Sequence, residues 1–398
     1  MSMPVPNITD LLRQTSARDF DGDEAGRLTA IKEAQRQINR LQLPAERGWE
    51  LAFENWVILG TLQTFIDLAI FERWNDAGGG QMPVEDLCGL AKVDVDPKLL
   101  AKDFIEEVAE EQYKPTEFSL CLGDKESPQG VWIQGGHDHF KYMGLDYFSR
   151  FMQETSYQNP IDEVNTAYRL GSPENLDLWA RCSAKPEIQA SFSVWMDNWT
   201  SYKTHWTDYF DTSILLSCDI DPSAPILVDV GGNRGHDISL FRARHHADLP
   251  TRSLVLQDRP EALDLAEVDR DEIQIMPHDF LTPQPVRGAR AYMFHAVFHD
   301  WSDEKSLMIL KHTTAAMNSG YSRLLILDVV LPPTGASAVQ PGLDVSMMGL
   351  VSGKERTQRM WEELLSAAGL RILKIWKDSK RFESVIEAEL NAAEYKGE

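Results

Sequence analysis

A histidine flanked by acidic residues stands in the C-terminal half of the chain, in the segment FHDWSDE that begins at Phe298. An imidazole at the end of a strand can accept a proton near neutral pH. A phenol or an enol must lose such a proton before its oxygen becomes a nucleophile. A lone histidine is more often structural than catalytic, so a catalytic role for His299 depends on partners elsewhere in the chain.

Two further carboxylates could orient this histidine. Asp328 ends the following predicted strand, LLILDVVLPP, and Glu355 lies in the later loop SGKERT. A carboxylate on one imidazole nitrogen fixes the tautomer and stabilises the imidazolium, while the other nitrogen takes the proton. We therefore predict three catalytic residues, with His299 as the general base and Asp328 and Glu355 beside it.

A glycine-rich loop follows an apolar segment earlier in the same half. Residues 226–230 run into the loop GGNRG, and a helix is expected to begin near Asp237. Glycines let the backbone turn sharply and let a ligand approach without a Cβ in the way, while Asp229 offers a carboxylate. The loop matches neither GxGxxG nor GxxxxGK[ST], so it supports neither a nicotinamide dinucleotide nor a nucleoside triphosphate.

Acidic residues also stand at the ends of the next two predicted strands. From Asp258 a carboxylate can hydrogen-bond both hydroxyls of a ribose. Asp279 and Phe280, in the segment HDF, could recognise and flank an adenine. Either acid alone could equally be a helix N-cap or a turn residue. Three successive strand ends with suitable groups nevertheless favour a ligand that carries a ribose and an adenine.

The elements that position these residues alternate regularly after Pro225. Short apolar runs are separated by helical patterns, and the runs read ILVDVGG, SLVLQDR, IQIMPHDF, ARAYMFHAVFHDW and RLLILDVVLPP. Near-continuous apolar strands that alternate with helices indicate a mainly parallel sheet covered on both faces. We predict the α/β fold class, with a Rossmann-like doubly wound domain over residues 206–398.

Residues 1–205 are expected to form a separate, mostly helical domain. Apolar residues recur at helical spacing from Ile8 to Leu43, and residues 49–74 predict one apolar core helix. The patterns PVEDLCGLAKV and DPKLLAKDFIEEVAEE, followed by a hairpin over residues 118–133, predict a winged helix. Its acidic character favours a dimerisation or lid role over DNA binding. Aromatic-rich helices over residues 145–210 would bridge the halves and line a pocket.

Composition excludes several classes of protein. The length of 398 residues suits two domains, and the net charge of −23 disfavours nucleic acid and anionic membranes as partners. The N-terminus does not resemble a signal peptide and no apolar run is long enough to span a bilayer, so we expect a cytoplasmic protein. No CxxC or Cys/His cluster suggests a metal site, and we expect reduced thiols at Cys88, Cys121, Cys182 and Cys218.

Five motifs together carry a family resemblance. GGNRG, LQD, HDF, HDWSDE and GKERT, in this order, resemble the plant caffeate-type and fungal polyketide O-methyltransferases. The resemblance implies S-adenosyl-L-methionine as the cofactor, a small-molecule acceptor, and the catalytic roles given above. It also implies a homodimer in which the N-terminal domain of one subunit helps to close the pocket of the other. Apolar contacts to the acceptor are implied at Met196 and Met347.

The predicted site is therefore a set of residues from both halves. The cofactor would be held by residues of four strand ends: Asp229, Gly231, Gly232, Gly235, Asp258, Arg259, Asp279, Phe280 and His295. The acceptor would contact His137, Met196, Trp199, Asp300 and Met347.

Three residues depart from the pattern of the family. Asn233 replaces the usual third glycine, which is tolerable because asparagine also adopts positive φ. Asp328 stands where a glutamate is usual, which shortens its reach toward His299 by one methylene. His295 stands where many relatives carry a basic or polar residue near the cofactor.

Two other functions stay open. Some fungal proteins that resemble this family keep the cofactor and use its positive charge for dehydration and pericyclic cyclisation without methyl transfer. In them the base is often altered and a second histidine comes from the N-terminal half. This chain keeps His299, which favours transfer, but it also has His137 and His139 in the segment GGHDHF, which we expect to be a solvated loop. An inactive dimeric scaffold would require His299 and its acids to be coincidental.

The sequence does not identify the acceptor. Pocket shape depends on how the aromatic segment around Trp195, Trp199 and Tyr202 folds over the site.

Overall fold

The computed structural model describes residues 15–51, 55–93, 104–216, 220–334, 339–378 and 382–391. Cys218, one of the four predicted thiols, lies outside these ranges. The chain divides into two compact units. Unit 1 contains Met1–Ile70 and Gln81–Pro115, and unit 2 contains Phe71–Gly80 and Thr116–Glu398.

Unit 1 is helical with a small antiparallel sheet. Its helices are η1 (Ala17–Phe20), α2 (Glu24–Leu41), α3 (Pro44–Trp49), α4 (Asn55–Asp67) and α6 (Val84–Gly89). The strands β1 (Met82–Pro83), β2 (Ile105–Ala109) and β3 (Gln112–Pro115) pair in the order β1-β3-β2. Helix α2 is amphipathic in sequence, yet none of its 18 residues is buried in this chain.

The predicted apolar helix over residues 49–74 is wrong in its extent. The described part of this segment contains the end of α3, then α4, and then α5 (Ile70–Asp76). Ala69, between α4 and α5, has a φ of 49°, which lies in the left-handed region and ends the regular helix.

The predicted hairpin over residues 118–133 is also wrong, because this segment forms α7 (Glu117–Gly123) and α8 (Pro128–Phe140). Thr116 and Ser127 cap the two helices by accepting backbone N–H groups through their side chains, and Pro128 occupies the first position of α8. The hairpin of unit 1 lies instead at β2 and β3, where β2 falls within the segment predicted as the second helix and β3 follows it directly. Glu111, in the turn between these strands, has a φ of 54°.

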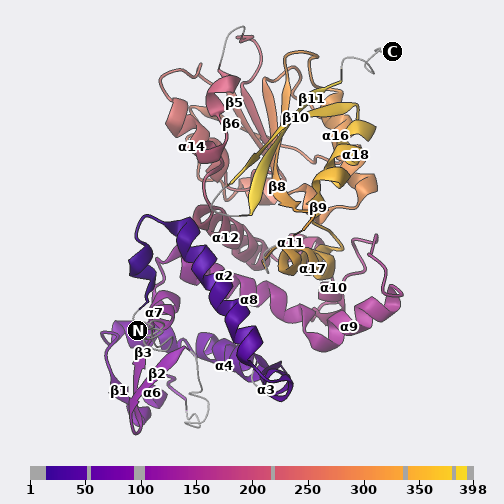
Figure 1. Ribbon diagram of the computed structural model, residues 1–398. Helices are drawn as coiled ribbons and strands as arrows, with labels where there is room; N and C mark the ends of the chain where they lie inside the picture. Colours follow the sequence, from indigo (N-terminus) through magenta and orange to yellow (C-terminus); the bar gives the residue numbers. More distant parts are fainter. Residues whose placement is uncertain are drawn as a thin grey trace, which may run out of the picture. The chain divides into compact units, whose positions relative to one another are not determined.

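Unit 2 contains the predicted Rossmann-like sheet (Figure 1). Its strands follow the order β10-β11-β8-β7-β4-β5-β6, and β9 pairs with β8. Neighbours from β6 to β8 are parallel, whereas β11 is antiparallel to both β8 and β10. The bounds are β4 (Leu227–Val230), β5 (Leu254–Asp258), β6 (Ile273–Pro277), β7 (Ala291–His295), β8 (Arg323–Leu331), β9 (Arg356–Thr357), β10 (Leu370–Lys377) and β11 (Glu383–Leu390).

Helices cover both faces of this sheet, which explains why its strands are apolar on both sides. Alternate residues point to opposite faces, so Leu227 packs in one core with Trp206 and Phe241, whereas Val228 packs in the other with Trp361. Burial of each large apolar side chain contributes about 1.5–3 kcal/mol. The flanking helices are α13 (Trp206–Tyr209), η5 (Thr212–Leu215), α14 (His236–His245), α15 (Pro260–Leu263), α16 (Asp303–Thr314) and α18 (Gln358–Ala367).

A second group of helices lies beside the edge at which β4, β5 and β7 end (Figure 1). Here α11 (Leu178–Ala184), α12 (Pro186–Tyr202) and α17 (Val339–Val351) belong to the same compact unit as the sheet. The other members are η4 (Lys141–Met143), α9 (Leu145–Glu154), α10 (Ala167–Gly171) and η6 (Phe298–Asp300). Because residues 116–205 pack with the sheet, the compact units do not follow the predicted boundary at residue 205, and the functional division there stays a prediction.

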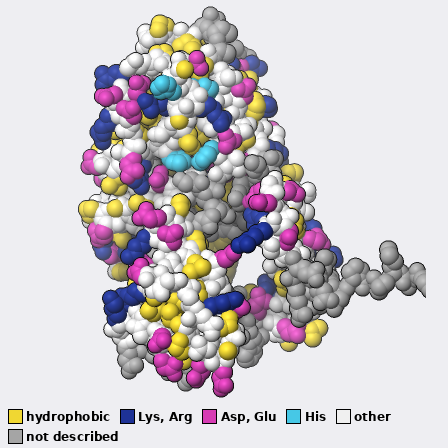
Figure 2. Space-filling view, turned by 90° about the vertical axis from the view of Figure 1, so that its left-hand side faces the viewer, with side chains coloured by type: hydrophobic (Ala, Val, Ile, Leu, Met, Phe, Trp, Pro, Cys, Tyr) yellow, Lys and Arg dark blue, Asp and Glu magenta, His cyan; other side chains and the backbone are white. Residues whose placement is uncertain are grey.

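Two properties bear on the excluded classes. Among the described helices, none is long and apolar enough to cross a membrane. Acidic and basic side chains are interspersed over the described atoms of the face shown in Figure 2, which presents no large continuous basic patch.

Candidate active site

A cavity of about 440 Å³ opens where the sheet edge meets α11, α12 and α17, a size typical of small-molecule sites. Most of the predicted site residues line it: Met196, Trp199, Gly231, Gly232, Asp258, Arg259, Asp279, Phe280, His295, His299, Asp300, Met347 and Glu355. Asp229, Gly235 and Asp328 do not line it, although each lies in contact with residues that do. The sequence therefore predicted one cavity from residues spread over 160 positions, from Met196 to Glu355.

The glycine loop packs closely against neighbouring strand ends. Gly231 has a φ of 75°, and a Cβ there would lie 3.0 Å from Val297 and 3.5 Å from the ring of Phe280. A Cβ on Gly232 would lie 2.6 Å from the carboxyl carbon of Asp229. Only glycine leaves the loop backbone open to a ligand at this distance from the strands.

Asp258 connects the glycine loop to the segment that follows β5. Its Oδ2 accepts the backbone N–H of Asn233 at 2.8 Å, and its Oδ1 accepts that of Arg259 at 2.7 Å. Burial raises the pKa of this carboxyl, and the two N–H groups oppose that effect. Because a carboxylate has about four acceptor positions, Asp258 keeps capacity for ribose hydroxyls.

Aromatic rings follow Asp258 along the cavity wall. Phe280 meets Trp301 edge to face, with ring centroids 5.9 Å apart, and Trp301 lies nearly parallel to Trp179 of α11 at 6.4 Å. Asp279 is exposed and accepts the N–H of Leu281, so it is a turn residue as well as a lining residue. Trp179 and Trp301 were not among the predicted site residues, although Trp301 directly follows the histidine and aspartate of the HDWSDE motif.

Asp229 lies beneath the glycine loop and not on the cavity wall. It is 1% exposed, and neither of its carboxylate oxygens has a hydrogen-bond partner among the described atoms. Burial and the nearby Asp237 raise the pKa of this carboxyl well above its ordinary value. Asp229 thus offers a buried acceptor group close to the loop at which a cofactor would bind.

His295 belongs to a buried network of charged side chains. Its Nδ1 lies 2.6 Å from Asp237 Oδ2, and its Nε2 lies 3.2 Å from Lys203 Nζ and 3.4 Å from Glu383 Oε2. Lys203 Nζ also binds Glu383 Oε1 at 2.5 Å. Burial alone would lower the pKa of His295, but Asp237 and Glu383 raise it to about 9. The network joins the end of α12 to β7, β11 and α14.

The three predicted catalytic residues form one cluster, in which polar atoms lie within 4.8 Å of one another. His299 Nδ1 lies 3.1 Å from Glu355 Oε1, within a hydrogen bond, and 3.4 Å from Asp328 Oδ1. Its Nε2 lies 3.5 Å from Asp300 Oδ1. Glu355 is therefore the closer orienting group, and Asp328 still reaches the same nitrogen despite its shorter side chain.

The charge of this cluster controls its protonation. Burial opposes a charged imidazole, but the carboxylates of Asp328, Glu355 and Asp300 outweigh it and raise the pKa of His299 to about 10. Burial also raises the pKa of Asp300 to about 7 and that of Asp328 to about 6. The imidazole is thus held in its protonated form near neutral pH, and it can act as a base only once that proton has left.

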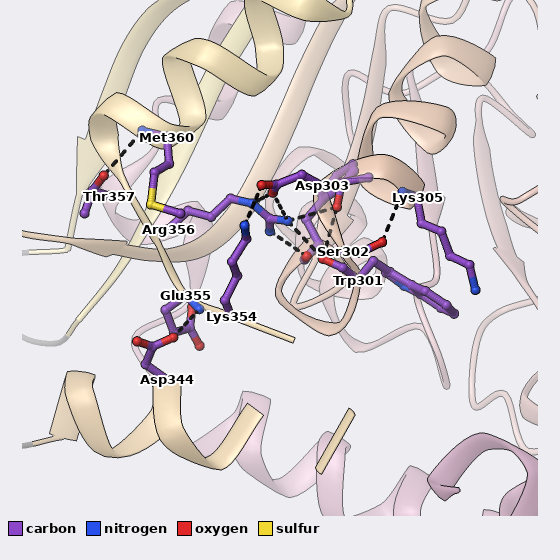
Figure 3. A network of polar contacts seen from close by, with 12 residues as sticks. Trp301, Ser302, Asp303, Lys305, Asp344, Lys354, Glu355, Arg356, Thr357 and Met360 are labelled. Atoms are coloured by element: carbon purple, nitrogen blue, oxygen red, sulfur yellow. Dashed lines mark hydrogen bonds and ion pairs between the residues drawn. The ribbon is translucent and has the colours of Figure 1, made fainter. Parts of the chain in front are cut away.

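Hydrogen bonds from Arg356 and Lys354 connect the GKERT loop to the HDWSDE segment (Figure 3). Arg356 is fully buried and donates to the backbone carbonyls of Phe298 and Trp301 and to the carboxylate of Asp303. Lys354 N–H donates to the carbonyl of His299 at 2.9 Å. The same loop that carries Glu355 therefore fixes the backbone that carries His299.

A glycine makes this close approach possible. A Cβ on Gly353 would lie 2.0 Å from the carbonyl oxygen of His299, so the two loops could not pack as they do with any other residue there.

Apolar side chains of α12 and α17 close the other side of the cavity. Met196, Trp195 and Trp199 come from α12, and Met347 from α17. The ring of Trp199 stacks on Phe382 with centroids 5.8 Å apart, and Lys203 Nζ lies 4.9 Å from its centre. These residues form an apolar, aromatic wall near His299.

His137 and His139 do not lie in a solvated loop, so that expectation is wrong. Both belong to α8, and neither is among the described lining residues of the cavity. His139 is 2% exposed, has no hydrogen-bond partner at either nitrogen, and stacks on Trp195 at 5.3 Å. Burial lowers its pKa to about 4, so it is neutral. A glycine-rich helix, QGGHDHF, was mistaken for a loop.

The residues of the strand edge fit S-adenosyl-L-methionine on the geometry alone. A glycine loop without Cβ atoms, an acid with acceptor capacity at Asp258, a flanking ring at Phe280 and an unpartnered buried carboxyl at Asp229 match the ribose, adenine and amino-acid parts of that molecule. A Rossmann-like sheet with this edge and a carboxylate-bound histidine on the same cavity defines a methyltransferase of the class I type.

Comparisons with known proteins agree with this class. The model of the O-methyltransferase domain matches residues 178–371. The chain is 42% identical to the O-methyltransferase ATR12 of Stachybotrys chlorohalonatus, over 98% of this chain and 100% of that protein. It is 32% identical to the O-methyltransferase mfmE of Annulohypoxylon moriforme, over 97% and 96% of the two chains. The chain belongs to the O-methyltransferase family, and it is an S-adenosylmethionine-dependent O-methyltransferase.

Solved structures share the fold. LepI in complex with S-adenosylmethionine superimposes with a TM-score of 0.81 at 24% identity, covering 96% of this chain and 97% of LepI. OxaC in complex with S-adenosylhomocysteine and oxaline gives a TM-score of 0.80 at 23% identity, covering 96% of each chain. These two similarities support the architecture of the chain and do not bear on its acceptor.

Proposed function

We propose that this enzyme methylates a phenol or enol hydroxyl of a small aromatic or polyketide-type secondary metabolite, with His299 as the general base. The observation that carries the proposal is the hydrogen bond of His299 Nδ1 to Glu355, on a ring that lines the same cavity as Asp258 and Phe280. One imidazole nitrogen is oriented by the protein, and the ring borders the space that an acceptor would enter.

The strand edge supplies the cofactor site in this proposal. Asp258 would accept the ribose hydroxyls, Phe280 and Asp279 would border the adenine, and the loop from Gly231 to Gly235 with Arg259 and His295 would surround the remainder. When bound, the cofactor would supply an activated methyl group for transfer to the acceptor oxygen.

The residues of this chain then align and deprotonate the acceptor. Met196, Trp199 and Met347 hold its apolar body, and Asp300 lies beside His299 Nε2. His299 takes the hydroxyl proton, while Glu355 and Asp328 stabilise the resulting imidazolium. Alignment of this kind can contribute roughly 7–11 kcal/mol to lowering a barrier.

The test is a label-transfer assay. The purified protein is incubated with methyl-labelled S-adenosylmethionine and a panel of phenolic polyketides and hydroxypyridones, and label in the product is followed together with loss of substrate. Label in an O-methyl ether supports the proposal. Label on carbon or nitrogen, or on no member of a broad panel of hydroxyl acceptors, would contradict it.

A second candidate function rests on His139. This buried histidine has no hydrogen-bond partner and stacks on Trp195, whose ring lines the cavity. A neutral imidazole behind the acceptor wall would suit a cofactor-assisted dehydration or pericyclic cyclisation without methyl transfer. In the same assay this function would convert the substrate to an isomer or a dehydrated product without label. This conversion should be lost in His139→Ala and kept in the matched control His137→Ala, because both histidines belong to α8.

The remaining proposals concern the cellular location, the oligomeric state and the domain roles of the enzyme. We place it in the cytoplasm as a homodimer, with residues 1–205 providing dimerisation and a lid and residues 206–398 providing catalysis. None of the residues of α2 is buried in the described chain, which supports a helical partner surface in unit 1.

A further inference from the structure

Helix α12 presents one stripe of side chains to the cavity and carries a second stripe beside it. Phe192, Met196 and Trp199 recur at helical spacing and line the acceptor wall. Gln189, Ser193 and Asp197 recur every four residues, so they share a second stripe. This second stripe is the one that contacts the loops of the proposed cofactor site.

Each residue of the second stripe is joined to one of those loops. The Nδ2 of Asn233 donates to the carbonyl of Ser193 at 3.1 Å. Arg234 Nη1 lies 3.5 Å from Asp197 Oδ2, and Arg259 Nη2 lies 3.4 Å from Gln189 Oε1. The contact of Asn233 is the shortest of the three and the most central along α12, and Ser193 is fully buried.

Asp258 connects these contacts to the ribose site. Its two carboxylate oxygens accept the N–H groups of Asn233 and Arg259, which are the residues that reach Ser193 and Gln189. A ligand that binds Asp258 would therefore contact the carboxylate that holds both loops, and the loops are hydrogen-bonded to α12. The carboxylate of Asp258 and the side-chain amide of Asn233 therefore connect the cofactor edge to the acceptor wall.

Asn233 contributes what a glycine at this position cannot. Its φ of 50° is compatible with glycine, so the backbone shape of the loop does not require asparagine. The side-chain amide adds the hydrogen bond to α12. We propose that Asn233 is a positioning residue, whose amide transmits occupancy of the cofactor site to α12 and thereby sets the acceptor wall. The proposal rests on the cofactor site proposed above.

Hydrogen–deuterium exchange of α12 tests this role without knowledge of the acceptor. Exchange of residues 186–202 is measured in the free protein and in protein saturated with S-adenosylhomocysteine, with affinity for that ligand measured by calorimetry. The variants are Asn233→Gly, which keeps positive φ, and Asn233→Asp, which keeps the shape but loses the amide donor. Asn175→Gly is the matched control, because Asn175 also has positive φ, 53°, but is exposed.

We expect S-adenosylhomocysteine to slow exchange of α12 about tenfold in the wild type and in Asn175→Gly, which corresponds to roughly 1.4 kcal/mol. In both Asn233 variants this protection should fall to within about twofold of the free protein, even at ligand concentrations raised to compensate for any change in affinity, while the loop 231–235 stays protected.

Three results would overturn the proposal. One is full protection of α12 in both Asn233 variants, and another is no ligand-dependent protection of α12 in the wild type. The third is a loss of ligand affinity in both variants that accounts for the lost protection, which would make Asn233 a cofactor ligand only. Failure of the wild type to bind S-adenosylhomocysteine would instead remove the proposed cofactor site itself.

Discussion

The two carboxylates on His299 Nδ1 are not equivalent. Glu355 hydrogen-bonds the nitrogen at 3.1 Å, whereas Asp328 lies at 3.4 Å and also accepts the backbone N–H of Val329. Both carboxylates are buried, and each keeps one oxygen without a partner among the described atoms. The glutamate therefore governs the orientation of the ring, and the aspartate mainly contributes charge.

Neutral replacements should separate these contributions. We expect Glu355→Gln to lower kcat about 100-fold, in the range of a lost general-base effect, and Asp328→Asn to lower it about tenfold. Steady-state methyl transfer at saturating cofactor measures both, and circular dichroism controls for folding. An equal loss in the two variants, or a larger loss in Asp328→Asn, would contradict the assigned geometry.

The protonation state of His299 predicts an alkaline limb in the pH profile. The imidazole must be neutral to act as a base, and its pKa is raised to about 10 in the free protein. Below that pKa the ring carries a proton, so kcat/KM should rise with pH through the neutral range. Removal of one carboxylate, in Glu355→Gln, lowers the pKa and should move the midpoint to lower pH. A profile that is flat across neutral pH in the wild type speaks against His299 as the base.

The sequence motifs identified the residues of the site better than the contacts between them. His299 was predictable because strand ends of a parallel sheet meet at one edge. Asp328 was predicted to end its strand, but it lies inside β8, three residues before the strand ends, and Glu355 lies in the loop before β9. The bond of Asn233 to Ser193 was not predictable, because its acceptor is a backbone carbonyl 40 residues away. Trp179 was missed for the same reason, since nothing near it in sequence indicates that its ring faces Trp301.

Among the elements, the GKERT loop fixes the position of His299. Gly353 leaves no room for a Cβ beside the His299 carbonyl, and Arg356 binds three groups of the FHDWSDE segment. The loop and the base therefore behave as one unit, although 54 residues separate His299 from Gly353 in the sequence.

A methyl group at Gly353 should displace this unit. We expect Gly353→Ala to lower kcat about 100-fold, because a shift of about 1 Å in a catalytic group has an effect of that size. It should also reduce the free energy of unfolding by about 1–3 kcal/mol through overpacking. Gly342→Ala is the control, since a Cβ there meets no atom within 4 Å. Wild-type activity in Gly353→Ala would show that the two loops move independently.

The His295 network predicts how stability depends on pH. The folded-state pKa of His295, about 9, lies above its ordinary value of 6.5. Its contribution to stability is therefore fully present below pH 6.5 and is lost as pH rises through about 9. We expect the variant His295→Asn to have a lower thermal midpoint than the wild type, and we expect this difference to be largest at acidic to neutral pH. A difference that widens above pH 9 would contradict this assignment.

Element prediction succeeded in the sheet and failed in the helices that precede it. Near-continuous apolar runs such as ILVDVGG are typical of strands that are buried on both faces of a parallel sheet. Residues 118–133 were predicted as a hairpin, but Ser127 caps α8 and Pro128 begins it. Helix starts and turns use the same residue types, and only the following contacts decide between them.

For the molecule as a whole, α2 is a helix that leaves large apolar side chains exposed in the described chain. None of its residues is buried, and Ile31, Ile38 and Leu41 are 53%, 47% and 79% exposed. Helices of this kind gain most of their stability from packing of an apolar face, so α2 should pack in an assembly. A second copy of the chain is the partner that the family resemblance suggests.

Charges on this face should separate the subunits. We expect the double variant Ile31→Glu and Ile38→Glu to sediment as a monomer at a micromolar concentration at which the wild type is a dimer. Arg40→Glu changes the net charge by the same amount on the opposite side of α2, so it should remain dimeric. A wild type that sediments as a monomer would refute the predicted homodimer.

The most direct test of the central claim is single-turnover methyl transfer by His299→Asn with S-adenosylmethionine bound. If His299 is the base of an O-methyltransferase, the variant should bind the cofactor with an affinity within about threefold of the wild type. It should then transfer label to the acceptor at least about 100-fold more slowly. Transfer at the wild-type rate by a fully loaded variant would contradict the claim, because the hydroxyl proton would then leave without His299.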